Sequence, residues 1–211
     1  MNLANKRQQF LLFQTPLDLA HAYWQKLLKP GDCVIDATCG NGHDTLFLSG
    51  IVLDMDNSAA EKKGYVIAID TQEQAIENTR NLLNQNLPKN LLDRISLHQQ
   101  CHSSFPPSLR DESVNLVVYN LGYLPGGDKA LTTVCPTTIK SLKAATPLIA
   151  PGGAICITCY PGHAAGVPEE EMALEFAASL DPHHWSSCHH RWVNRRNAPS
   201  LILIQRGCYP T

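Results

Sequence analysis

The sequence predicts a single α/β domain over residues 1–211, built on a seven-stranded, mostly parallel sheet with helices on both faces. Three observations predict this fold class. A chain of 211 residues is long enough for one domain with a sizeable core and short for two. Short apolar runs alternate with longer segments of helical periodicity, as in βα units. The last two predicted strands are joined by a turn, so we expect the last strand to be antiparallel.

The first elements have clear boundaries. A helix is predicted over 16–29, because Thr15 can cap it, Pro16 suits its first turn, and Pro30 followed by glycine ends it. The apolar run 33–37 then predicts a buried strand, and a glycine-containing turn leads into a short helix that ends near residue 50.

The remaining elements follow from the same two patterns. Short apolar runs predict strands at 65–69, 94–98, 114–118, 154–159, 184–193 and 200–206. Helical spacing of apolar residues predicts helices over 73–84, 132–149 and 169–180. Residues 1–15 precede the domain core as an N-terminal extension, and the polar segment 53–63 is predicted to be a surface insertion.

Composition excludes several classes of protein. The charged fraction of 17% and the apolar fraction of 44% argue against a disordered chain, and the net charge of −2 excludes a general basic coat for nucleic acid. The eight cysteines are dispersed, several of them in apolar runs, which indicates reduced thiols in the cytoplasm. No apolar run is long enough to cross a membrane, and the first residues do not resemble a signal peptide, so we expect no membrane partner.

The segment 36–45 (Asp-Ala-Thr-Cys-Gly-Asn-Gly-His-Asp-Thr) joins the first strand to the next helix. Its glycines let the backbone approach a ligand, and the N–H groups of the helix N-terminus can bind it. The third glycine of a pyrophosphate-binding motif is absent, and a carboxylate at this turn suits a cationic ligand, such as an ammonium next to a sulfonium. A tight turn without a ligand is the alternative. The candidate ligand-binding residues are Asp36, Thr38, Gly40, Asn41, Gly42, Asp44 and Thr45.

Asp70 ends the second predicted strand, where a carboxylate can accept hydrogen bonds from both ribose hydroxyls of a nucleoside. Gln72 lies next to it, near the expected adenine or ribose. The alternative is that Asp70 caps the helix over 73–84. Together with the acidic glycine turn, Asp70 indicates S-adenosylmethionine (SAM) as the cofactor rather than NAD.

A third motif, Asn-Leu-Gly-Tyr-Leu-Pro, begins at Asn120, where the fourth strand ends. The Asn120 side-chain carbonyl and a backbone carbonyl can accept two N–H bonds from an amine and aim its lone pair at a methyl group, so that catalysis is mostly positioning. Tyr123 can stack on a flat base. We therefore assign Asn120, Gly122 and Tyr123 as candidate catalytic residues; a Gly/Pro turn that merely leaves the strand is the alternative.

Two further features concern the substrate. His163 follows the fifth strand and could accept a proton from an amine, or it could be a histidine bonded within a structural turn. Residues 183–196 hold four His and three Arg without an acid, plus Trp185 and Trp192, which predicts a local RNA-binding patch; the alternative is a polar hairpin with its tryptophans in the core. The candidate RNA-binding residues are Arg191, Asn194, Arg195, Arg196 and Asn197.

A zinc site is not expected. Cys156 and Cys159 are three residues apart on a predicted strand, which places their side chains on opposite faces. The histidine pairs are adjacent in the sequence and diverge for the same reason, and the paired C-x₂-C spacing of zinc sites is missing.

Four strings resemble a known family: 36–45, Asn-Leu-Gly-Tyr-Leu-Pro-Gly-Gly-Asp-Lys at 120–129, Tyr-Pro-Gly-His at 160–163, and Val-Asn-Arg-Arg-Asn-Ala-Pro at 193–199. The chain is similar over about residues 16–206 to the small "putative rRNA methylases", also called YtqB-like or MnmM-like. The resemblance implies a class I SAM-dependent methyltransferase (Rossmann-like) fold. It places Asn41, Gly42, Asp44, Asp70 and Gln72 in the cofactor pocket, and Cys101, which replaces a more usual Ser, and His102 where the family contacts adenine.

The resemblance also implies a reaction: methylation of the aminomethyl group of a tRNA wobble uridine, from 5-aminomethyl-2-thiouridine to 5-methylaminomethyl-2-thiouridine. The alternatives are methylation of an amine on rRNA or on a small molecule, and a non-catalytic module that binds SAM or RNA. The methyltransferase core fills the chain, so recognition of the tRNA anticodon region must come from the core's own loops or from a second copy of the chain in a homodimer.

Overall fold

The computed structural model describes residues 13–53, 63–122, 126, 133–162 and 166–208. Its strands are β1 (Cys33–Asp36), β2 (Tyr65–Asp70), β3 (Ile95–Gln99), β4 (Val114–Leu121), β5 (Ile149–Cys159), β6 (Trp185–His190) and β7 (Ser200–Arg206). Its helices are α1 (Pro16–Leu27), α2 (His43–Val52), α3 (Glu73–Asn86), α4 (Lys89–Leu92), α5 (Cys135–Ala145), the short 3₁₀ helix η1 (Thr146–Leu148) and α6 (Gly166–Ser179).

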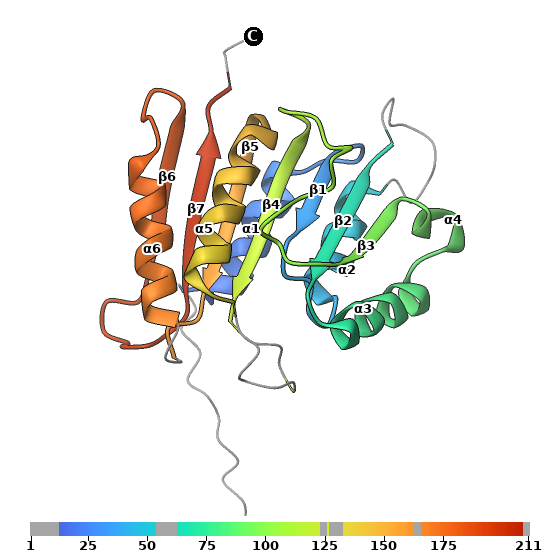
Figure 1. Ribbon diagram of the computed structural model, residues 1–211, viewed down its shortest axis with the longest axis horizontal. Coiled ribbons are helices and arrows are strands. Elements are labelled where there is room, and N and C mark those ends of the chain that lie inside the picture. Colours follow the sequence, from blue (N-terminus) through green and yellow to red (C-terminus); the bar gives the residue numbers. More distant parts are fainter. Residues whose placement is uncertain (1–12, 54–62, 123–125, 127–132, 163–165, 209–211) are drawn as a thin grey trace, which may run out of the picture.

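All seven strands form one sheet in the order β3-β2-β1-β4-β5-β7-β6 (Figure 1). The pairs from β3 to β5 are parallel, whereas β7 is antiparallel to both of its neighbours, β5 and β6. The predicted fold class is confirmed, including the antiparallel last strand. Because β6 therefore runs parallel to β5, the turn between β6 and β7 lies at the carboxyl edge of the sheet, where the other parallel strands end.

Helices cover both faces of the sheet (Figure 1). On one face, α1 and α2 pack on strand residues such as Val34 and Leu116, with Trp24 fully buried among them. On the other face, α5 and α6 pack on alternate strand residues such as Val117. Cys156 belongs to the first of these layers and Cys159 to the second, as their spacing predicts. All eight cysteines are free thiols.

The beginning of α1 has the predicted cap. The Thr15 hydroxyl accepts a hydrogen bond from the Asp18 backbone N–H at 3.2 Å, and Pro16 occupies the first turn. The helix ends at Leu27, two residues earlier than predicted. No helix in the described segments is long and apolar enough to cross a membrane. Residues 1–12 of the predicted extension and 54–62 of the predicted insertion lie outside the described residues.

Strand β4 extends three residues beyond the predicted 114–118, and the extension includes Asn120. Asn120 lies within the sheet, paired with Thr158 of β5, instead of in a loop after the strand. Its backbone direction is therefore fixed by the pairing with β5, which a loop residue would lack.

Strand β5 begins at Ile149 instead of residue 154, because Gly152 and Gly153 belong to the strand rather than to a turn. The β4–β5 register shifts between Val114 and Leu116, and Gly152 has a φ of +82°. A Cβ on Gly153 would lie 2.8 Å from the Asn115 carbonyl oxygen, so glycine is what lets the two strands approach at this bulge.

The helices differ from prediction mainly at their ends. The helix predicted over 132–149 is α5 followed by η1, because Pro147 cannot donate the next α-helical hydrogen bond. Helix α6 begins at Gly166, three residues before the predicted start, and the single turn α4 was not predicted.

Candidate active site

The glycine turn between β1 and α2 packs tightly against α3. Gly42 has a φ of +85°, and a Cβ there would lie 2.8 Å from the Thr79 Cα. The Thr79 hydroxyl donates to the Gly40 carbonyl at 3.0 Å. Two features therefore disfavour a side chain at position 42: the positive φ and the close contact with Thr79. Glycine is needed for the turn to reach the start of α2 in this conformation.

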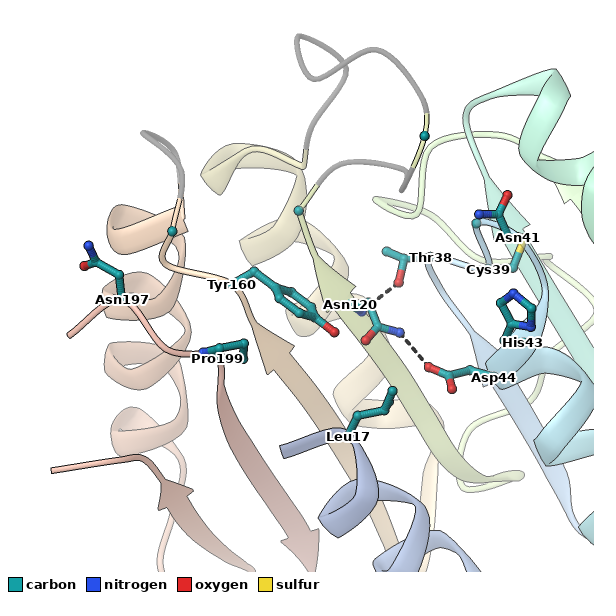
Figure 2. Close-up of a pocket in the computed structure, with 14 residues that line it drawn as sticks. Leu17, Thr38, Cys39, Asn41, His43, Asp44, Asn120, Tyr160, Asn197 and Pro199 are labelled. Carbon is teal, nitrogen blue, oxygen red and sulfur yellow. Dashed lines mark hydrogen bonds between the residues drawn. The ribbon is translucent and has the colours of Figure 1, made fainter. Parts of the chain in front are cut away.

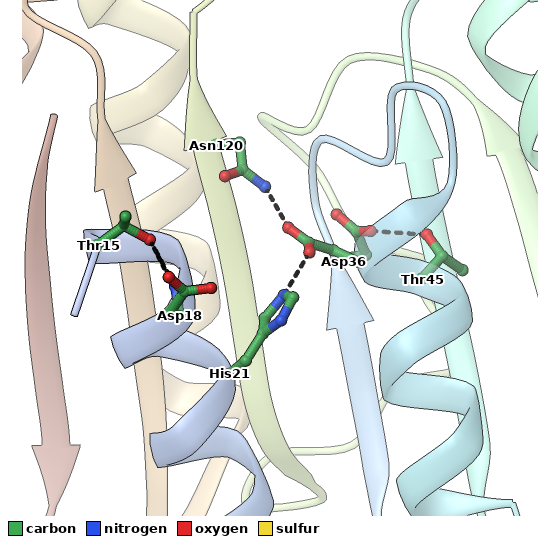
Figure 3. Close-up of polar contacts among 7 residues, drawn as sticks. Thr15, Asp18, His21, Asp36, Thr45 and Asn120 are labelled. Atoms are coloured by element: carbon green, nitrogen blue, oxygen red, sulfur yellow. Dashed lines mark hydrogen bonds and ion pairs between the residues drawn. The ribbon is translucent and has the colours of Figure 1, made fainter. Parts of the chain in front are cut away.

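Asp36 and Thr45 hold this turn from beneath. Asp36 is fully buried, accepts a hydrogen bond from the Thr45 hydroxyl at 2.6 Å (Figure 3), and accepts one from the Thr38 backbone N–H at 3.3 Å. Burial, together with the nearby negative charges of Asp44 and Asp70, raises the pKa of the Asp36 carboxyl to about 7, although the hydrogen bonds from Thr45 and Thr38 oppose this shift. Both predicted residues thus lie under the turn and support it.

Asp70, at the end of β2, connects two loops. One carboxylate oxygen accepts from the Gly40 N–H at 3.0 Å and the other accepts from the Gln72 N–H at 3.0 Å. Gln72, not Asp70, is the N-cap position of α3, so the alternative role for Asp70 as a helix cap is wrong. Each carboxylate oxygen keeps a lone pair, so Asp70 can still accept a hydroxyl from a ligand.

Asn120 is held at two points (Figures 2 and 3). Its backbone N–H donates to the Thr38 hydroxyl at 2.7 Å, and its side-chain Nδ2 donates to the Asp44 carboxylate at 2.8 Å. The other Asp44 oxygen accepts from His21 Nε2 at 2.8 Å. Because a carboxylate can only accept, it fixes which way the Asn120 amide faces and leaves Oδ1 as the atom offered to a donor.

Thr38, Asp44 and Asn120 line a cavity of about 720 Å³ at the carboxyl edge of the sheet (Figure 2), whereas Asp36 and Asp70 do not. Seven of the predicted residues are among those that line it: Thr38, Gly40, Asn41, Asp44, Asn120, Gly122 and Asn197. Lining residues that the sequence did not indicate are Leu17, Cys39, His43, Gly126, Tyr160, Gly162 and Pro199. The cavity is thus bounded by the glycine turn, the ends of β4 and β5, the beginning of α1 and the β6–β7 turn.

His102 and Cys101 lie beyond β3, outside this cavity lining. The His102 ring is buried, meets Tyr119 edge-on with centroids 6.0 Å apart, and its Nε2 has no hydrogen-bond partner among the described residues. Burial lowers the pKa of this imidazole, while the charge of Asp70 opposes that shift. Cys101 accepts a weak hydrogen bond from the Ser103 N–H. The described residues therefore leave a buried ring nitrogen of His102 without a hydrogen-bond partner, just beyond the end of β3.

Comparisons with known proteins agree with this geometry. A family model described as "Putative rRNA methylase" matches residues 66–206. The chain belongs to this family. It is 38% identical over 188 residues to the Arabidopsis thaliana protein named "tRNA (mnm(5)s(2)U34)-methyltransferase, chloroplastic", covering 89% of this chain and 68% of the relative.

Two solved structures of bacterial proteins have the same fold. A protein of Clostridium thermocellum described as a putative rRNA-methylase is 35% identical, with a TM-score of 0.82 and coverage of 92% of this chain and 98% of the other. A putative methyltransferase of Streptococcus mutans, solved in complex with S-adenosylhomocysteine (SAH), is 29% identical, with a TM-score of 0.76 and coverage of 92% and 99%. The chain is a methyltransferase with the class I fold.

The residues present fit the SAM cofactor of such methyltransferases. Gly42, with its positive φ and its close contact with Thr79, fixes the turn whose Gly40 and Asn41 line the cavity. Asp70 retains acceptor capacity at the end of β2, and His102 Nε2, which has no hydrogen-bond partner among the described residues, offers a buried polar atom beyond the end of β3. Gly40 lines the cavity and donates its N–H to Asp70, which connects the end of β2 to the cavity.

Sequence reasoning did not assign a role to His21 or to Tyr160. His21, on α1, bonds Asp44; its only sequence signal is that it shares a helix face with Leu17 and Trp24, which does not identify its partner. Tyr160 lines the cavity, and burial raises the pKa of its hydroxyl, with a further increase from the charge of Asp44. It stands in the quoted 160–163 string, from which we selected His163 instead. His163 and Tyr123 lie outside the described residues.

The predicted RNA-binding residues lie in the β6–β7 turn. Arg191 and residues 193–197 are exposed, and Asn197, with a φ of +58°, reaches the cavity. Trp192 is partly buried beneath the Arg195 guanidinium, 4.2 Å from the ring centroid, and meets Phe13 edge-on. These side chains line a second groove of about 800 Å³ against the beginning of α1. Trp185, in contrast, packs on the core, so the alternative of core tryptophans applies to that residue alone.

The histidines of β6 bond to protein groups. His189 Nε2 lies 3.2 Å from Glu170, and His190 Nε2 lies 3.2 Å from the Tyr23 hydroxyl. The described residues contain no group of three His, Cys, Asp or Glu side chains arranged to hold a metal ion.

Proposed function

We propose that this chain is a SAM-dependent N-methyltransferase that methylates the aminomethyl group of a tRNA wobble uridine, forming 5-methylaminomethyl-2-thiouridine from 5-aminomethyl-2-thiouridine. The observation that carries the proposal is the amide of Asn120, whose NH₂ is bound by Asp44 and whose oxygen is left for an N–H donor at the cavity. The name of the Arabidopsis relative supports this choice of substrate.

The glycine turn, Asp70 and His102 would hold the cofactor. SAM, when bound, supplies an electrophilic methyl group on a sulfonium. The Asp44 carboxylate, at the start of α2, makes this end of the cavity negative, which favours a cationic ligand. A dinucleotide with its diphosphate would be disfavoured by the same charge.

The substrate amine would donate an N–H to Asn120 Oδ1. A primary amine has one lone pair, so fixing its N–H bonds fixes the direction of attack, and positioning of this kind can supply much of the rate enhancement. Asn120 is suited to that task because β4 pairs on both sides and Thr38 holds its backbone N–H. The amine must be neutral to attack, and an amide acceptor stabilises the ammonium form less than a carboxylate would.

The base must leave the anticodon stack to enter the cavity. The β6–β7 turn is placed to receive the RNA around it, since Asn197 and Pro199 line the cavity and Asn194 and Arg195 line the adjoining groove. Arg191, Arg195 and Arg196 would contact phosphates, and Trp192 offers an aromatic surface to a base. We expect the anticodon stem-loop to be bound by this turn, with any further contacts supplied by a second copy of the chain.

The experiment is nucleoside mass spectrometry of tRNA from a strain lacking the gene, complemented with the wild type or with Asn120→Ala. We expect the deletion to accumulate 5-aminomethyl-2-thiouridine, the wild type to restore the methylated base, and Asn120→Ala to fail while binding SAM normally by calorimetry. Unchanged tRNA nucleosides together with an altered rRNA or small-molecule amine would favour the alternative substrates. Full complementation by Asn120→Ala would indicate a non-catalytic RNA-binding module.

A further inference from the structure

Three polar side chains from three separate elements form a continuous chain that ends at the substrate-facing amide (Figure 3). His21 of α1 lies 2.8 Å from one oxygen of Asp44 of α2, and Asn120 of β4 lies 2.8 Å from the other. His21 is not a lining residue of the cavity, and its hydrogen bond to Asp44 connects it to the lining.

The His21 ring is held in place by aromatic neighbours. It stacks on Phe47 with centroids 4.0 Å apart and an angle of 15° between the planes, and Trp24 lies 4.8 Å away. Both neighbours belong to helices packed on the same face of the sheet. Because the ring is confined on its face, its Nε2 has a fixed direction, toward the carboxylate.

Asp44 needs a second partner to hold its orientation. Asp36 lies close enough for the two carboxylates to repel, and the Asp44 side chain is only 12% exposed. With one hydrogen bond, to Asn120 alone, the carboxylate could rotate about its Cβ–Cγ bond. The hydrogen bond from His21 occupies the opposite oxygen and fixes the plane of the carboxylate.

The orientation of Asn120 depends on that plane. An asparagine amide can turn over by exchanging its oxygen and nitrogen positions, and only the environment selects between them. Asp44 accepts and never donates, so it selects the arrangement in which NH₂ faces α2 and Oδ1 is offered to the cavity. A misplaced acceptor would leave the amine free to turn away from the methyl group.

We propose that His21 is a positioning residue for methyl transfer, acting through Asp44 on the amide of Asn120. This role rests on the proposed function of Asn120 as the acceptor for the substrate amine. It makes α1, which precedes the parallel sheet, part of the catalytic arrangement.

Two variants distinguish the effect of the hydrogen bond from His21 to Asp44 from the effect of the packing of its ring on Phe47. His21→Phe keeps an aromatic ring on Phe47 and removes the donor, whereas His21→Gln places an amide N–H at about the position of Nε2. We expect kcat on tRNA to fall ~10- to 100-fold in His21→Phe, with the SAM dissociation constant unchanged, and to return to within about threefold of wild type in His21→Gln. Thr15→Val removes the cap of the same helix and serves as the control: its melting temperature should fall while its kcat does not.

Wild-type kcat in His21→Phe, or equal losses in both His21 variants, would overturn the proposal. A wild-type enzyme inactive on tRNA would instead overturn the proposed function.

The hydrogen-bond chain is tested separately by NMR, using the side-chain ¹⁵N–¹H₂ signal of Asn120, which is assigned by its loss in Asn120→Asp. We expect exchange of these protons with water to accelerate about tenfold or more in His21→Phe and to remain slow in His21→Gln. Unchanged exchange in His21→Phe would show that His21 does not hold the amide.

Discussion

Asp36 contributes to the site without touching the cavity. It is fully buried, it holds Thr45 and Thr38, and its pKa is about 7 in the folded protein. In the unfolded chain an aspartate has a pKa of about 4. At a pH between about 4 and 7, the folded protein therefore keeps a proton on Asp36 that the unfolded chain has lost. The stability contributed by protonated Asp36 is therefore present below about pH 4 and is lost as the pH rises toward 7.

Asp36→Asn should remove this pH dependence, because asparagine keeps an acceptor for the Thr38 N–H and carries no charge. Between pH 5 and pH 8, the wild type should lose on the order of 2 kcal/mol more unfolding free energy than the variant. Urea denaturation of both proteins at the two pH values measures the difference. Parallel changes in the two proteins would show that Asp36 titrates normally.

Asn120 is the residue whose loss should affect chemistry most selectively. Asn120→Ala removes the acceptor for the amine and leaves the glycine turn, Asp70 and His102 in place. We expect kcat to fall ~100-fold or more, with a SAM dissociation constant within a few fold of wild type. Steady-state kinetics with tRNA and calorimetry with SAM measure the two quantities, and an equal loss of both would mean that Asn120 mainly supports the cofactor pocket.

At the scale of elements, the glycine turn and α2 form one unit in which only some glycines are required. Gly42 has a positive φ and lies against Thr79, whereas a Cβ on Gly50, later in α2, would meet nothing within 4 Å. Replacement by alanine should therefore lower the stability of the protein at Gly42 and raise it at Gly50.

Gly42→Ala should lower the unfolding free energy by ~2 kcal/mol or more and weaken SAM binding, because both the backbone conformation and the Thr79 contact must change. Gly50→Ala, the matched control, should raise stability by ~0.5–1 kcal/mol, since alanine is the better helix former. Denaturant titration and calorimetry give both values. A stable Gly42→Ala protein with normal SAM affinity would contradict this account of the turn.

Some of the elements and site residues could be predicted from the sequence and others could not. Apolar runs locate all seven strands and the turn pattern identifies the antiparallel end, because both depend on local periodicity. The extent of β4 was not predicted because it depends on the pairing of Asn120 with Thr158, a residue distant in the sequence. Similarly, the acid-and-glycine pattern at 36–45 indicates a ligand site, but not that Asp36 is buried while Asp44 lines the cavity. The partnership of His21 with Asp44 depends on helix packing that no local pattern contains.

At the scale of the whole molecule, charge is unevenly distributed. The net charge is −2, yet Arg191, Arg195 and Arg196 all belong to the β6–β7 turn at the edge of the cavity. A local cluster of this kind can bind phosphates while the protein as a whole remains mildly acidic.

Replacing Arg191 or Arg196 with alanine should weaken tRNA binding about equally for matched and mismatched anticodons, because phosphate contacts carry no base information. Each loss should reduce the slope of log K against log salt concentration by ~1 unit or less. Binding titrations at several salt concentrations give that slope. The exposed Lys89→Ala on α4, remote from the turn in sequence and fold, is the control, and equal effects from it would argue against a localised RNA surface.

The antiparallel position of β7 has a consequence for altering this enzyme. Since β7 returns beside β5, the nine residues from Arg191 to Pro199 form a hairpin tip whose two ends are anchored in strands. A tip of this kind can be exchanged or lengthened without breaking any strand pairing, while the glycine turn and Asn120 belong to other crossovers. Asn197 and Pro199 line the cavity, so an exchange limited to residues 191–196 leaves that lining in place. If the turn binds RNA as proposed above, a segment transplanted there from a relative would change which RNA is bound and leave the methyl-transfer residues unaltered.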